Sequence, residues 1–448
     1  MKGYRSAIKI NCRFRLDTPL IIRTASDEDY LDLMVERTPD DKLHINGYVW
    51  ASLVRRAASR VKGLPEIFSS IGDYDGNLGV SPFWFESTVI PLIIADIRPG
   101  IRVDRRFGSV SEGALYSEEI VPPGYEIPLE FTIFLKESEA VGDVVGALGR
   151  ILHVIDGGIE NIGGNWSYGF GRLSLIDANY RVIDLTSDSG IGQLWTSQGD
   201  EHPLEKVKPE TVVPWSKIEV EAKILDGQIM AIHSDMPPMD FKGGAKPLPE
   251  YPDHFVFRGF VVESGKPVHR VVIPGKAIRQ ALLSVPVERR LRTRGDDICL
   301  TPADRCTCNR CNSYRKVNRN SRSAPDCTCK RCRWFGSTEQ GGIIAVTDAV
   351  VENEETEYIR RIHLCEHSMQ NINLFLEEFL TAGKFRFEII IDRRDDSSDE
   401  LVEMITATLE EMEANGSPPG WLRLGASSTC AGQVQVTNKK LIEFGGAR

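Results

Sequence analysis

The chain repeats one sequence pattern at two places. In each copy an alternating strand ends in a short turn, Ile45-Asn46-Gly47 or Ile273-Pro274-Gly275, and a helix carrying basic residues follows. Later in each copy a glycine-rich turn leads into a last strand, at 163–173 and at 424–434. A chain of 448 residues is too long for one ordinary core and suits two domains of about 200 residues. The repetition therefore predicts two similar domains.

Hydrophobic periodicity predicts the order of elements in these domains. Residues 5–16 and 126–136 alternate as half-buried strands do, and residues 140–155 carry apolar side chains at helical spacing. The order in the first copy is β-α-β-β-α-β, which is the ferredoxin-like, RRM-type pattern, with an insertion over 64–125. The second copy repeats the order. We expect an α+β protein with two such domains in tandem, at 1–184 and 215–448, joined by a Ser-, Asp-, Gly- and Pro-rich linker at 185–214.

Composition limits the function and the location. No apolar run reaches about 18 residues, which predicts no membrane span, and the start Met1–Arg5 leads into a strand rather than a signal peptide. We expect a cytoplasmic protein. The net charge of −10 argues mildly against nucleic-acid binding, but residues 289–333 contain 13 Lys or Arg and 4 Asp or Glu. Such a segment is either a local phosphate-binding face or a solvated charged loop.

Six of the ten cysteines lie between 306 and 332. They include two Cys-x-x-Cys pairs, Cys308/Cys311 and Cys329/Cys332, a spacing that lets four thiolates surround one Zn²⁺. Cys306, Cys327 and Cys299 are alternative ligands. No histidine lies between 270 and 362, so we expect a structural zinc that folds an insertion at about 294–336.

Four stretches of the sequence resemble the RAMP superfamily of CRISPR-associated proteins. They are Leu43–Gly47 with its echo Val272–Arg279, then Ile101–Gly108 with Gly113–Gly124, then Cys329–Gly336 with Ala345–Ala349, and the two glycine-rich turns. More closely, the chain resembles the backbone subunit of type III effector complexes. Two units in one chain are similar to the fused double subunits of type III-D.

The resemblance implies a role in RNA-guided defence. Backbone subunits stack along a guide crRNA, hold the duplex of guide and target RNA, and use a thumb hairpin from each unit to displace nucleotides. The implied partners are the guide crRNA, the target RNA, other RAMP subunits and the large polymerase-like subunit. Sequence is then read by base pairing, so no base-specific pocket is needed.

In the family, an acidic residue in an Asp-x-x-Val context cuts the target RNA. Asp32 fits this context 13 residues before Ile45, and Asp253 fits it 20 residues before Ile273. The longer spacing leaves Asp235 and Asp240 as rivals in the second half. The expected chemistry is attack by the RNA 2′-hydroxyl, with Mg²⁺ or Mn²⁺ held by the carboxylate or with the carboxylate as general base.

Glycines and cations are the candidates for holding the RNA backbone. A glycine-rich turn can approach a phosphate closely, and arginine or lysine contacts position RNA without reading its sequence. The predicted RNA-binding residues are Arg55, Arg102, Arg105, Arg106, Gly164, Gly169, Lys276, Arg279 and Gly425. Two other functions stay open: a non-catalytic RNA-binding scaffold of the same complex, and a guide-processing endonuclease of the same superfamily that uses a histidine or another general base.

Overall fold

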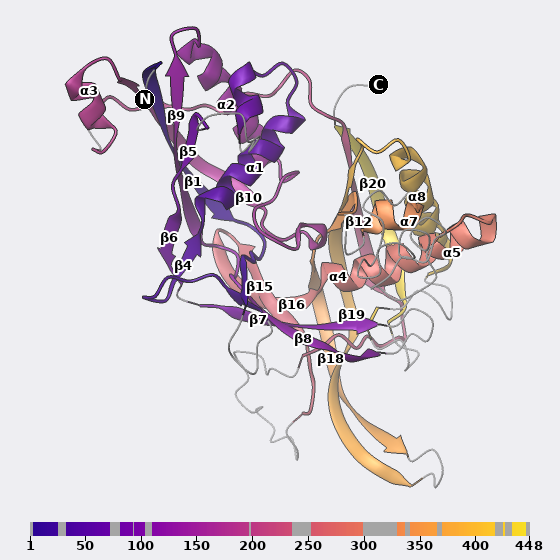
Figure 1. Cartoon of the computed structure of the whole chain (residues 1–448). Coiled ribbons are helices and arrows are strands. Elements are labelled where there is room, and N and C mark those ends of the chain that lie inside the picture. The colour runs from indigo at the N-terminus through magenta and orange to yellow at the C-terminus, as the bar shows by residue number, and fades with distance from the viewer. Residues whose placement is uncertain are drawn as a thin grey trace, which may run out of the picture.

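The structure is a computed structural model. It describes residues 3–25, 33–71, 81–92, 94–103, 110–196, 199–234, 252–298, 329–336, 341–364, 370–416, 424–425 and 432–444. The protein is of the α+β class, with mostly antiparallel sheets and fewer helices (Figure 1). None of the helices in these residues is long and apolar enough to cross a membrane.

The described elements of the first half, up to residue 204, form a five-stranded sheet, a four-stranded sheet β2-β3-β8-β7, a two-stranded sheet β4-β6 and several helices. They are β1 (Tyr4–Leu16), β2 (Arg23–Ala25), β3 (Leu33–Val35), β4 (Lys42–Ile45), α1 (Gly47–Arg60), η1 (Glu66–Ser70), β5 (Phe83–Phe85), β6 (Thr88–Pro91), β7 (Asp96–Val103), β8 (Val110–Ile120), β9 (Glu126–Lys136), α2 (Val141–Asp156), η2 (Trp166–Tyr168), β10 (Leu173–Asp184), α3 (Asp188–Gln193) and β11 (His202–Pro203).

The strands of the five-stranded sheet lie in the order β11-β10-β1-β9-β5, and all the pairs are antiparallel. Alternate residues of β1, from Ile8 to Leu16, are buried, as a sheet with one covered face requires. Asn46 directly precedes helix α1, and its side chain accepts a hydrogen bond from Tyr48 N, which caps the helix. The apolar faces of α1 and α2 contribute to the same core as β1 and β9.

The second half, from residue 215, has a second sheet and its own helices. They are β12 (Trp215–Ile224), β13 (His233–Ser234), β14 (Phe255–Val256), β15 (Arg258–Glu263), β16 (Lys266–Ile273), α4 (Gly275–Ile278), the π-helical turn η3 (Arg279–Ser284), α5 (Val285–Arg294), α7 (Lys330–Phe335), β17 (Ile344–Val346), β18 (Ala349–Leu364), β19 (Asn371–Asp392), α8 (Ser398–Asn415) and β20 (Val434–Phe444).

The second sheet repeats the strand order of the first. Strand β12 lies between β20 and β19, and β17 pairs with β19 on the other side. In the first sheet β1 likewise lies between β10 and β9, and β5 pairs with β9. Along the chain, helices α4 and α5 come after β12, the first strand of the second sheet, and α8 comes before β20, its last strand. In the first half, α1 likewise comes after β1 and α2 comes before β10.

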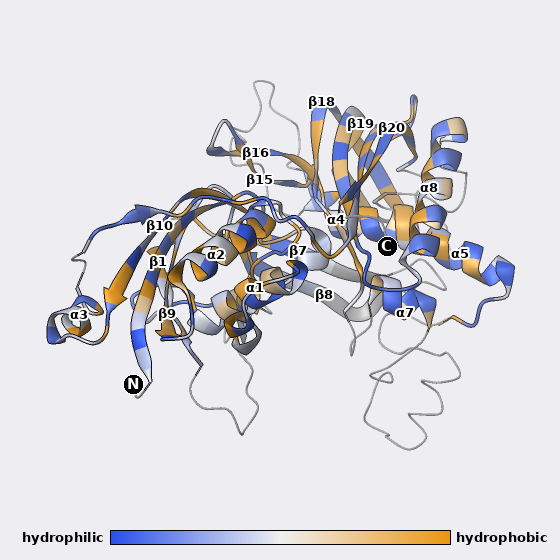
Figure 2. Cartoon of the chain, turned by 90° about the horizontal axis from the view of Figure 1, so that it is seen from above, coloured by the Kyte–Doolittle hydropathy of each residue, from blue (hydrophilic) through white to orange (hydrophobic). Residues whose placement is uncertain are grey.

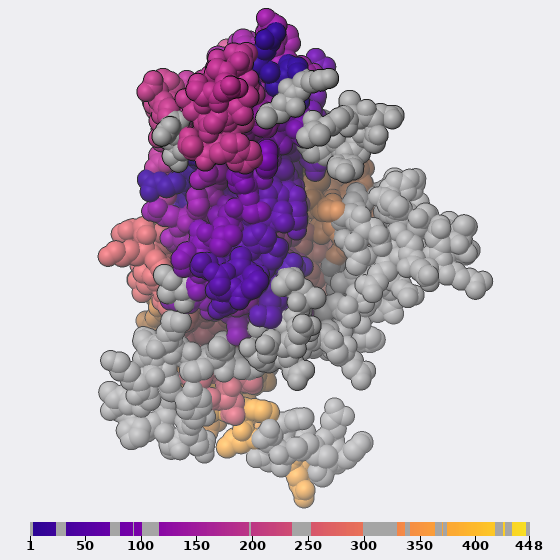
Figure 3. Space-filling model, turned by 60° about the vertical axis from the view of Figure 1, so that its left-hand side comes forward, coloured from indigo at the N-terminus to yellow at the C-terminus, as the bar shows by residue number. Residues whose placement is uncertain are grey.

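Each half carries a long hairpin between its second and third sheet strands. In the first half this hairpin is β7–β8, and in the second half it is β18 with the beginning of β19. Figure 1 shows the second hairpin projecting from the body, and Figure 2 shows β7 and β8 crossing between the halves. Orange residues of the arms of this hairpin also lie at the bottom of the space-filling view (Figure 3).

Two hydrophobic cores accompany the two sheets. The buried apolar residues of one core fall between Ile8 and Leu204, and those of the other between Ile218 and Val436. The residues expected to form a linker contain α3 and β11, and Leu204 among them is buried in the first core. This stretch therefore packs on the first half, where β11 pairs with β10 and Leu204 is buried.

Candidate nucleic-acid interface

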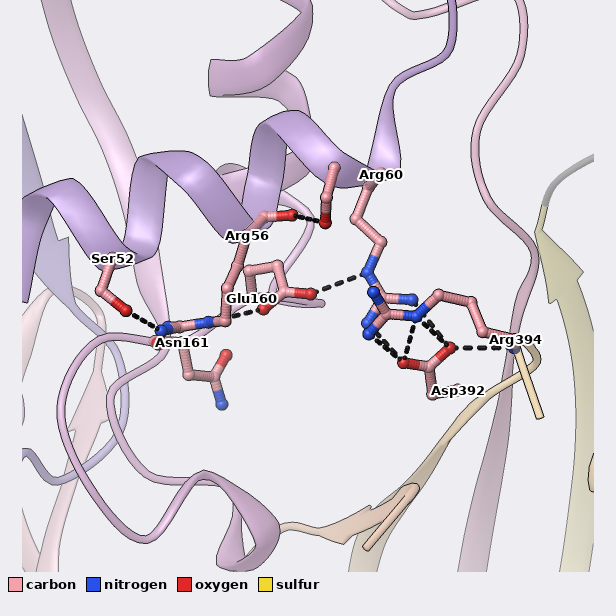
Figure 4. A network of polar contacts seen from close by, with 8 residues as sticks. Ser52, Arg56, Arg60, Glu160, Asn161, Asp392 and Arg394 are labelled. Carbon is pink, nitrogen blue, oxygen red and sulfur yellow. Dashed lines mark hydrogen bonds and ion pairs between the residues drawn. The ribbon is translucent and has the colours of Figure 1, made fainter. Parts of the chain in front are cut away.

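An ion network ties helix α1 to the second sheet. The Arg60 guanidinium contacts Glu160 Oε1 at 2.7 Å and both carboxylate oxygens of Asp392, at 3.0 and 2.9 Å (Figure 4). Arg56 adds a contact to Glu160 Oε2 at 3.0 Å, and Arg394 contacts Asp392 from the second half. Arg60 and Glu160 are both nearly inaccessible to solvent. This network fixes how the two halves meet.

Two further ion pairs cross between the halves. Arg98 of β7 is buried and contacts Asp348 Oδ2 at 2.6 Å, with its guanidinium 4.9 Å from the centre of the Phe170 ring. Arg172 contacts Glu388 at 2.7 Å. These contacts bring the glycine-rich turn of the first half against the start of β18 in the second half.

Lys276 and Arg279 of the second half lie over tyrosines of the first half. The Lys276 ammonium is 4.3 Å from the centre of the Tyr116 ring and 5.8 Å from that of Tyr168. The Arg279 guanidinium lies 5.6 Å from the Tyr168 ring and donates to Phe335 O at 2.6 Å. Two of the predicted RNA-binding cations therefore meet at the first glycine-rich turn. We call Arg23, Tyr116, Glu118, Asn165 and Tyr168, with Lys276 above them, the first-half site.

The electrostatics of this site favour an anion. Burial and, to a smaller extent, the nearby cation Arg23 together lower the pKa of Lys276 to about 8. Arg23 itself contacts Glu118 at 2.8 Å and the Asn165 side chain. Within the described ranges, Lys276 has no carboxylate or hydrogen-bond partner. A phosphate beside it would neutralise a partly desolvated charge, which is the condition under which a charge pair is strong.

Close packing accounts for the glycine at 169. Gly169 has φ of +76°, and a Cβ there would lie 2.7 Å from Thr347 Cα. Gly164 is half-exposed, and its N–H donates to Ile21 O at 2.9 Å. The structure thus gives Gly169 a packing role against the second half, whereas Gly164 is the more accessible of the two predicted glycines.

The two glycine-rich turns make the same hydrogen bonds. In the first, Ile162 N donates to Gly171 O at 2.9 Å, and Gly171 N donates to Pro19 O at 2.7 Å. In the second, the corresponding bonds are Leu424 N to Gly432 O at 2.9 Å and Gly432 N to Ile229 O at 2.6 Å. Gly425, with φ of +83°, packs against the carbonyl of Ala231. Both turns therefore dock on the segment that follows the first strand of their own half.

A buried glutamate makes matching contacts in both halves. Glu119 accepts from Val35 N at 3.0 Å and pairs with Arg37. Glu378 accepts from Val256 N at 3.0 Å and pairs with Arg258 at 2.9 Å. The segment from Val35 to Arg37 thus corresponds to the segment from Val256 to Arg258.

This correspondence places the candidate acids at equal sequence positions. Asp32 precedes Val35 by three residues, and Asp253 precedes Val256 by three. The seven additional residues between Asp253 and Ile273 belong to the longer hairpin β15–β16. Asp253 is exposed, and its Oδ2 accepts from Leu376 N at 2.8 Å. Asp32 lies outside the described residues, and so do Asp235 and Asp240, the rivals of Asp253.

The remaining RNA-binding candidates are not gathered at the first-half site. Arg55 is exposed on α1, where its neighbour Arg56 contacts Glu160. Arg102 belongs to β7, but its side chain is not among those described, and Arg105 and Arg106 lie outside the described residues.

The described part of the basic segment is largely paired with acids. Its ion pairs join Arg290 to Glu411, Arg294 to Glu400, Lys330 to Asp296, Arg331 to Glu288 and Arg333 to Asp395. The charge count over 289–333 missed this because four of the five partners lie outside that range, on α5, on α8 or just after β19. Five cations of the described part are therefore held by acids rather than presented singly to a phosphate.

Two of the four predicted zinc ligands are visible. Cys329 and Cys332 are buried at the beginning of α7, one helical turn apart. That placement fits two corners of a tetrahedral thiolate site. Cys308 and Cys311 lie outside the described residues. Among the residues described, no group of three or more potential metal ligands is found.

Sequence reasoning missed Arg23, Tyr116, Glu118 and Arg98. Arg98 and Tyr116 occupy the first hairpin, and only the crossing of that hairpin to the second half brings them to the site. Tyr116 and Glu118 lie in the stretch Gly113–Gly124 that carries the family resemblance, but the alternating pattern of a strand does not show which residues its side chains will contact.

The comparison with protein families bears on this site directly. Residues 13–174 match the model of the RAMP superfamily. The match runs from β1 to the beginning of β10, including the first hairpin and the first glycine-rich turn. It supports a RAMP protein and involvement in CRISPR-associated complexes. RAMP proteins include some CRISPR ribonucleases. A search of curated proteins finds no match.

Proposed function

We propose that this RAMP protein is the backbone subunit of an RNA-guided type III CRISPR effector complex, in the fused double-unit form of type III-D. The observation that carries the proposal is the repeated site. In both halves the same hydrogen bonds hold three parts together: the glycine-rich turn, the segment after the candidate aspartate and the base of a hairpin. A repeated arrangement suits a polymer with a regular repeat, such as a guide–target RNA duplex.

Each half would be one ferredoxin-like RAMP domain with a thumb hairpin. The proposed domains are 1–184 and 215–448, with 185–214 between them. The strand order β10-β1-β9-β5 and its counterpart β20-β12-β19-β17 support this reading, because β-α-β-β-α-β connections produce that order in ferredoxin-like domains.

The contact between the halves suggests how neighbouring RAMP subunits bind. Inside the chain, Asp348 links the turn before Lys276 to the first half: Gly275 N donates to Asp348 Oδ1, and Asp348 also contacts Arg98 of β7. The corresponding turn of the first half, at Gly47 and Tyr48, makes the matching bond to Ser87, and Tyr48 is 66% exposed. A neighbouring unit would use that exposed surface, and the large polymerase-like subunit would bind at one end of the stack.

The proposed activity is cleavage of the target RNA by 2′-hydroxyl transesterification at Asp32 and Asp253. A Mg²⁺ or Mn²⁺ held by such a carboxylate would stabilise charge on the phosphate, with phosphate oxygens and water completing its coordination. Asp253 stands at the base of the second hairpin, where a displaced nucleotide would lie. The second candidate is a non-catalytic scaffold, favoured by the hydrogen bond that engages Asp253 structurally.

Replacing Lys276 tests RNA binding at the first-half site. We expect Lys276→Met to weaken binding of the guide–target duplex by roughly tenfold, as loss of one charge-assisted phosphate contact does. Lys276→Arg should retain binding. Because the pKa of Lys276 is about 8, wild-type affinity should fall as pH rises above that value, whereas the arginine variant should stay flat. Filter binding between pH 7 and pH 9 measures both. Equal affinities in all three proteins, or a purified complex without RNA, would contradict the proposal.

The zinc is tested by metal analysis of the purified protein. The proposed ligands are Cys308, Cys311, Cys329 and Cys332, which predict about one zinc per chain. Cys329→Ser should lower that content and expose the segment 294–336 to protease, because the insertion would depend on the metal to fold. The buried Cys12 of β1 gives a matched control, since Cys12→Ser should leave the zinc content unchanged. Full zinc in Cys329→Ser would move the site to Cys306, Cys327 or Cys299.

A further inference from the structure

The outer face of the five-stranded sheet exposes two tryptophans. In β5 the side chain of Phe83 is buried in the core, so its neighbour Trp84 points to the opposite, outer face. Trp84 is 50% exposed, and Trp195, which follows α3, is 74% exposed. Their rings meet edge to face with centres 6.1 Å apart. Figure 1 shows α3 on the side of the sheet away from α1 and α2. Exposed tryptophans packed together are typical of a protein interface.

Backbone hydrogen bonds align this face with the corresponding face of the second half. After β5, Glu86 N donates to Glu130 O at 3.0 Å. After β17, Thr347 N donates to Glu388 O at the same distance, so Glu130 corresponds to Glu388. In the second half this face is an interface, because Glu388 accepts from Arg172 of the first half at 2.7 Å. The same face of the first half is therefore a surface on which a further chain can dock.

Two aromatic side chains change this face in the first half. Counted from the aligned residues, Trp84 takes the position of Ala345, which is buried in the second half. By the same count, Phe134 takes the position of Asp392, and Asp392 binds Arg60 at the contact between the halves. The face of the first half is thus more apolar than its counterpart and has one carboxylate fewer.

Two carboxylates stay exposed on the outer face. Within the described residues, neither Glu86 nor Glu130 has a side-chain partner. Lys9 of β1 lies on the same face, opposite Thr132, but no ion pair joins it to either glutamate in that part of the chain. Exposed carboxylates repel the phosphates of RNA. They instead favour a protein that supplies a lysine or an arginine.

A second copy of this chain offers no such cation at the corresponding position. Between the halves, Arg172 supplies the positive charge. The hydrogen bonds of the two glycine-rich turns align Gly171 with Gly432. The next residue is Arg172 in the first half and Gln433 in the second. The second half of another copy would therefore present an amide to Glu130, where the contact between the halves has a guanidinium.

We propose that the outer face formed by Trp84, Glu86, Glu130, Phe134 and Trp195 binds a protein chain other than this one. The inference rests on the proposed function, since it places the contact inside an effector complex. The partner covers both tryptophans with an apolar surface and presents a lysine or an arginine to Glu130. A buried tryptophan and a desolvated charge pair are strong contributions at protein interfaces. The face thus selects a different subunit and disfavours repeated addition of the same chain.

Photo-cross-linking in the purified effector complex tests the choice of partner. Benzoylphenylalanine in place of Trp84 keeps an aromatic side chain at the site. Irradiation should join it to a different chain, at a segment that carries a lysine or an arginine. The control places the same probe at Leu441 of β20, which is 46% exposed, and it should not reach that segment. Cross-links to a second copy, to RNA or to no chain would overturn the inference.

Two substitutions measure the contributions to binding of the cross-linked subunit. Trp84→Ala should weaken binding roughly thirtyfold, as loss of a tryptophan at the centre of an interface does, and Glu130→Lys by about tenfold or more. Both side chains are exposed, so the fold should be preserved. Glu403→Lys makes the same charge change on the exposed face of α8 and should leave binding unchanged. Interferometry with the full chain measures all three.

The outcomes separate this inference from the proposed function. Unchanged affinity in both Trp84→Ala and Glu130→Lys would overturn the inference, even in a complex that binds RNA and cuts it. A purified complex that contains no RNA and cuts none would instead refute the proposed function.

Discussion

Arg60→Ala should lower the free energy of unfolding by about 3–5 kcal/mol. Removing one partner of a buried ion pair leaves its carboxylates without compensation, and here two are affected, Glu160 and Asp392. Both lie at the contact between the halves (Figure 4). Because Arg56 and Arg394 still reach one carboxylate each, the loss should stay within that range. Urea unfolding followed by tryptophan fluorescence measures it.

Arg13 provides the matched control. It also pairs with two carboxylates, Asp177 and Glu126, but all three side chains are exposed to solvent. Water screens such pairs, so Arg13→Ala should change stability only slightly. If Arg60→Ala proved no more harmful than Arg13→Ala, the network at the contact would not be what holds the halves in place.

The pH dependence of stability follows from the same network. Burial opposes ionisation of Asp392, but hydrogen bonds from Arg394 and Arg60 outweigh it and hold its pKa below the ordinary value of 3.8. The carboxylate therefore contributes stability above the unfolded-state pKa and loses it as pH falls through the lower folded-state value. In Arg60→Ala one of the two arginines that lower the pKa of Asp392 is gone. Acid should therefore unfold the variant at a higher pH than the wild type.

Asp32→Asn and Asp253→Asn should each abolish one cut of the target RNA, by 10²-fold or more, with duplex binding retained. A carboxylate that holds a metal or takes a proton loses both capacities as an amide. Asparagine at 253 keeps an oxygen that can accept from Leu376 N, so this variant removes the charge and spares the structural bond. Mapping the target fragments by gel with labelled 5′ ends shows which cut is lost.

Two further variants serve as controls for the prediction about Asp32 and Asp253. Asp177→Asn, on the exposed face of the first sheet, is the control and should leave both cuts unchanged. Asp253→Ala also removes the hydrogen bond, and a defect seen only in the alanine variant would assign Asp253 a structural role. An unchanged cut pattern in both asparagine variants would favour the non-catalytic scaffold. Loss of a different cut in each variant would support one active site per half.

Part of this arrangement could be predicted from the sequence. The alternation of residues 5–16 and 126–136 and the helical spacing of 140–155 predicted β1, β9 and α2 almost to the residue, because burial of one face imposes a period on the chain. The repeated turns at Gly47 and Gly275 marked the duplication. The Asp-x-x-Val pattern located two acids at positions that the backbone contacts make equivalent.

The sequence by itself determined the class of fold, the repetition and the identity of the candidate acids, since these depend on local periodicity and on short motifs. Only the tertiary structure decided which cations meet which rings, that acids on α5 and α8 neutralise much of the basic segment, and that Trp84 packs against Trp195. These contacts join residues far apart in the chain. Ion pairing, desolvation and ring stacking act only over a few ångströms, so they depend on a packing that no local pattern specifies.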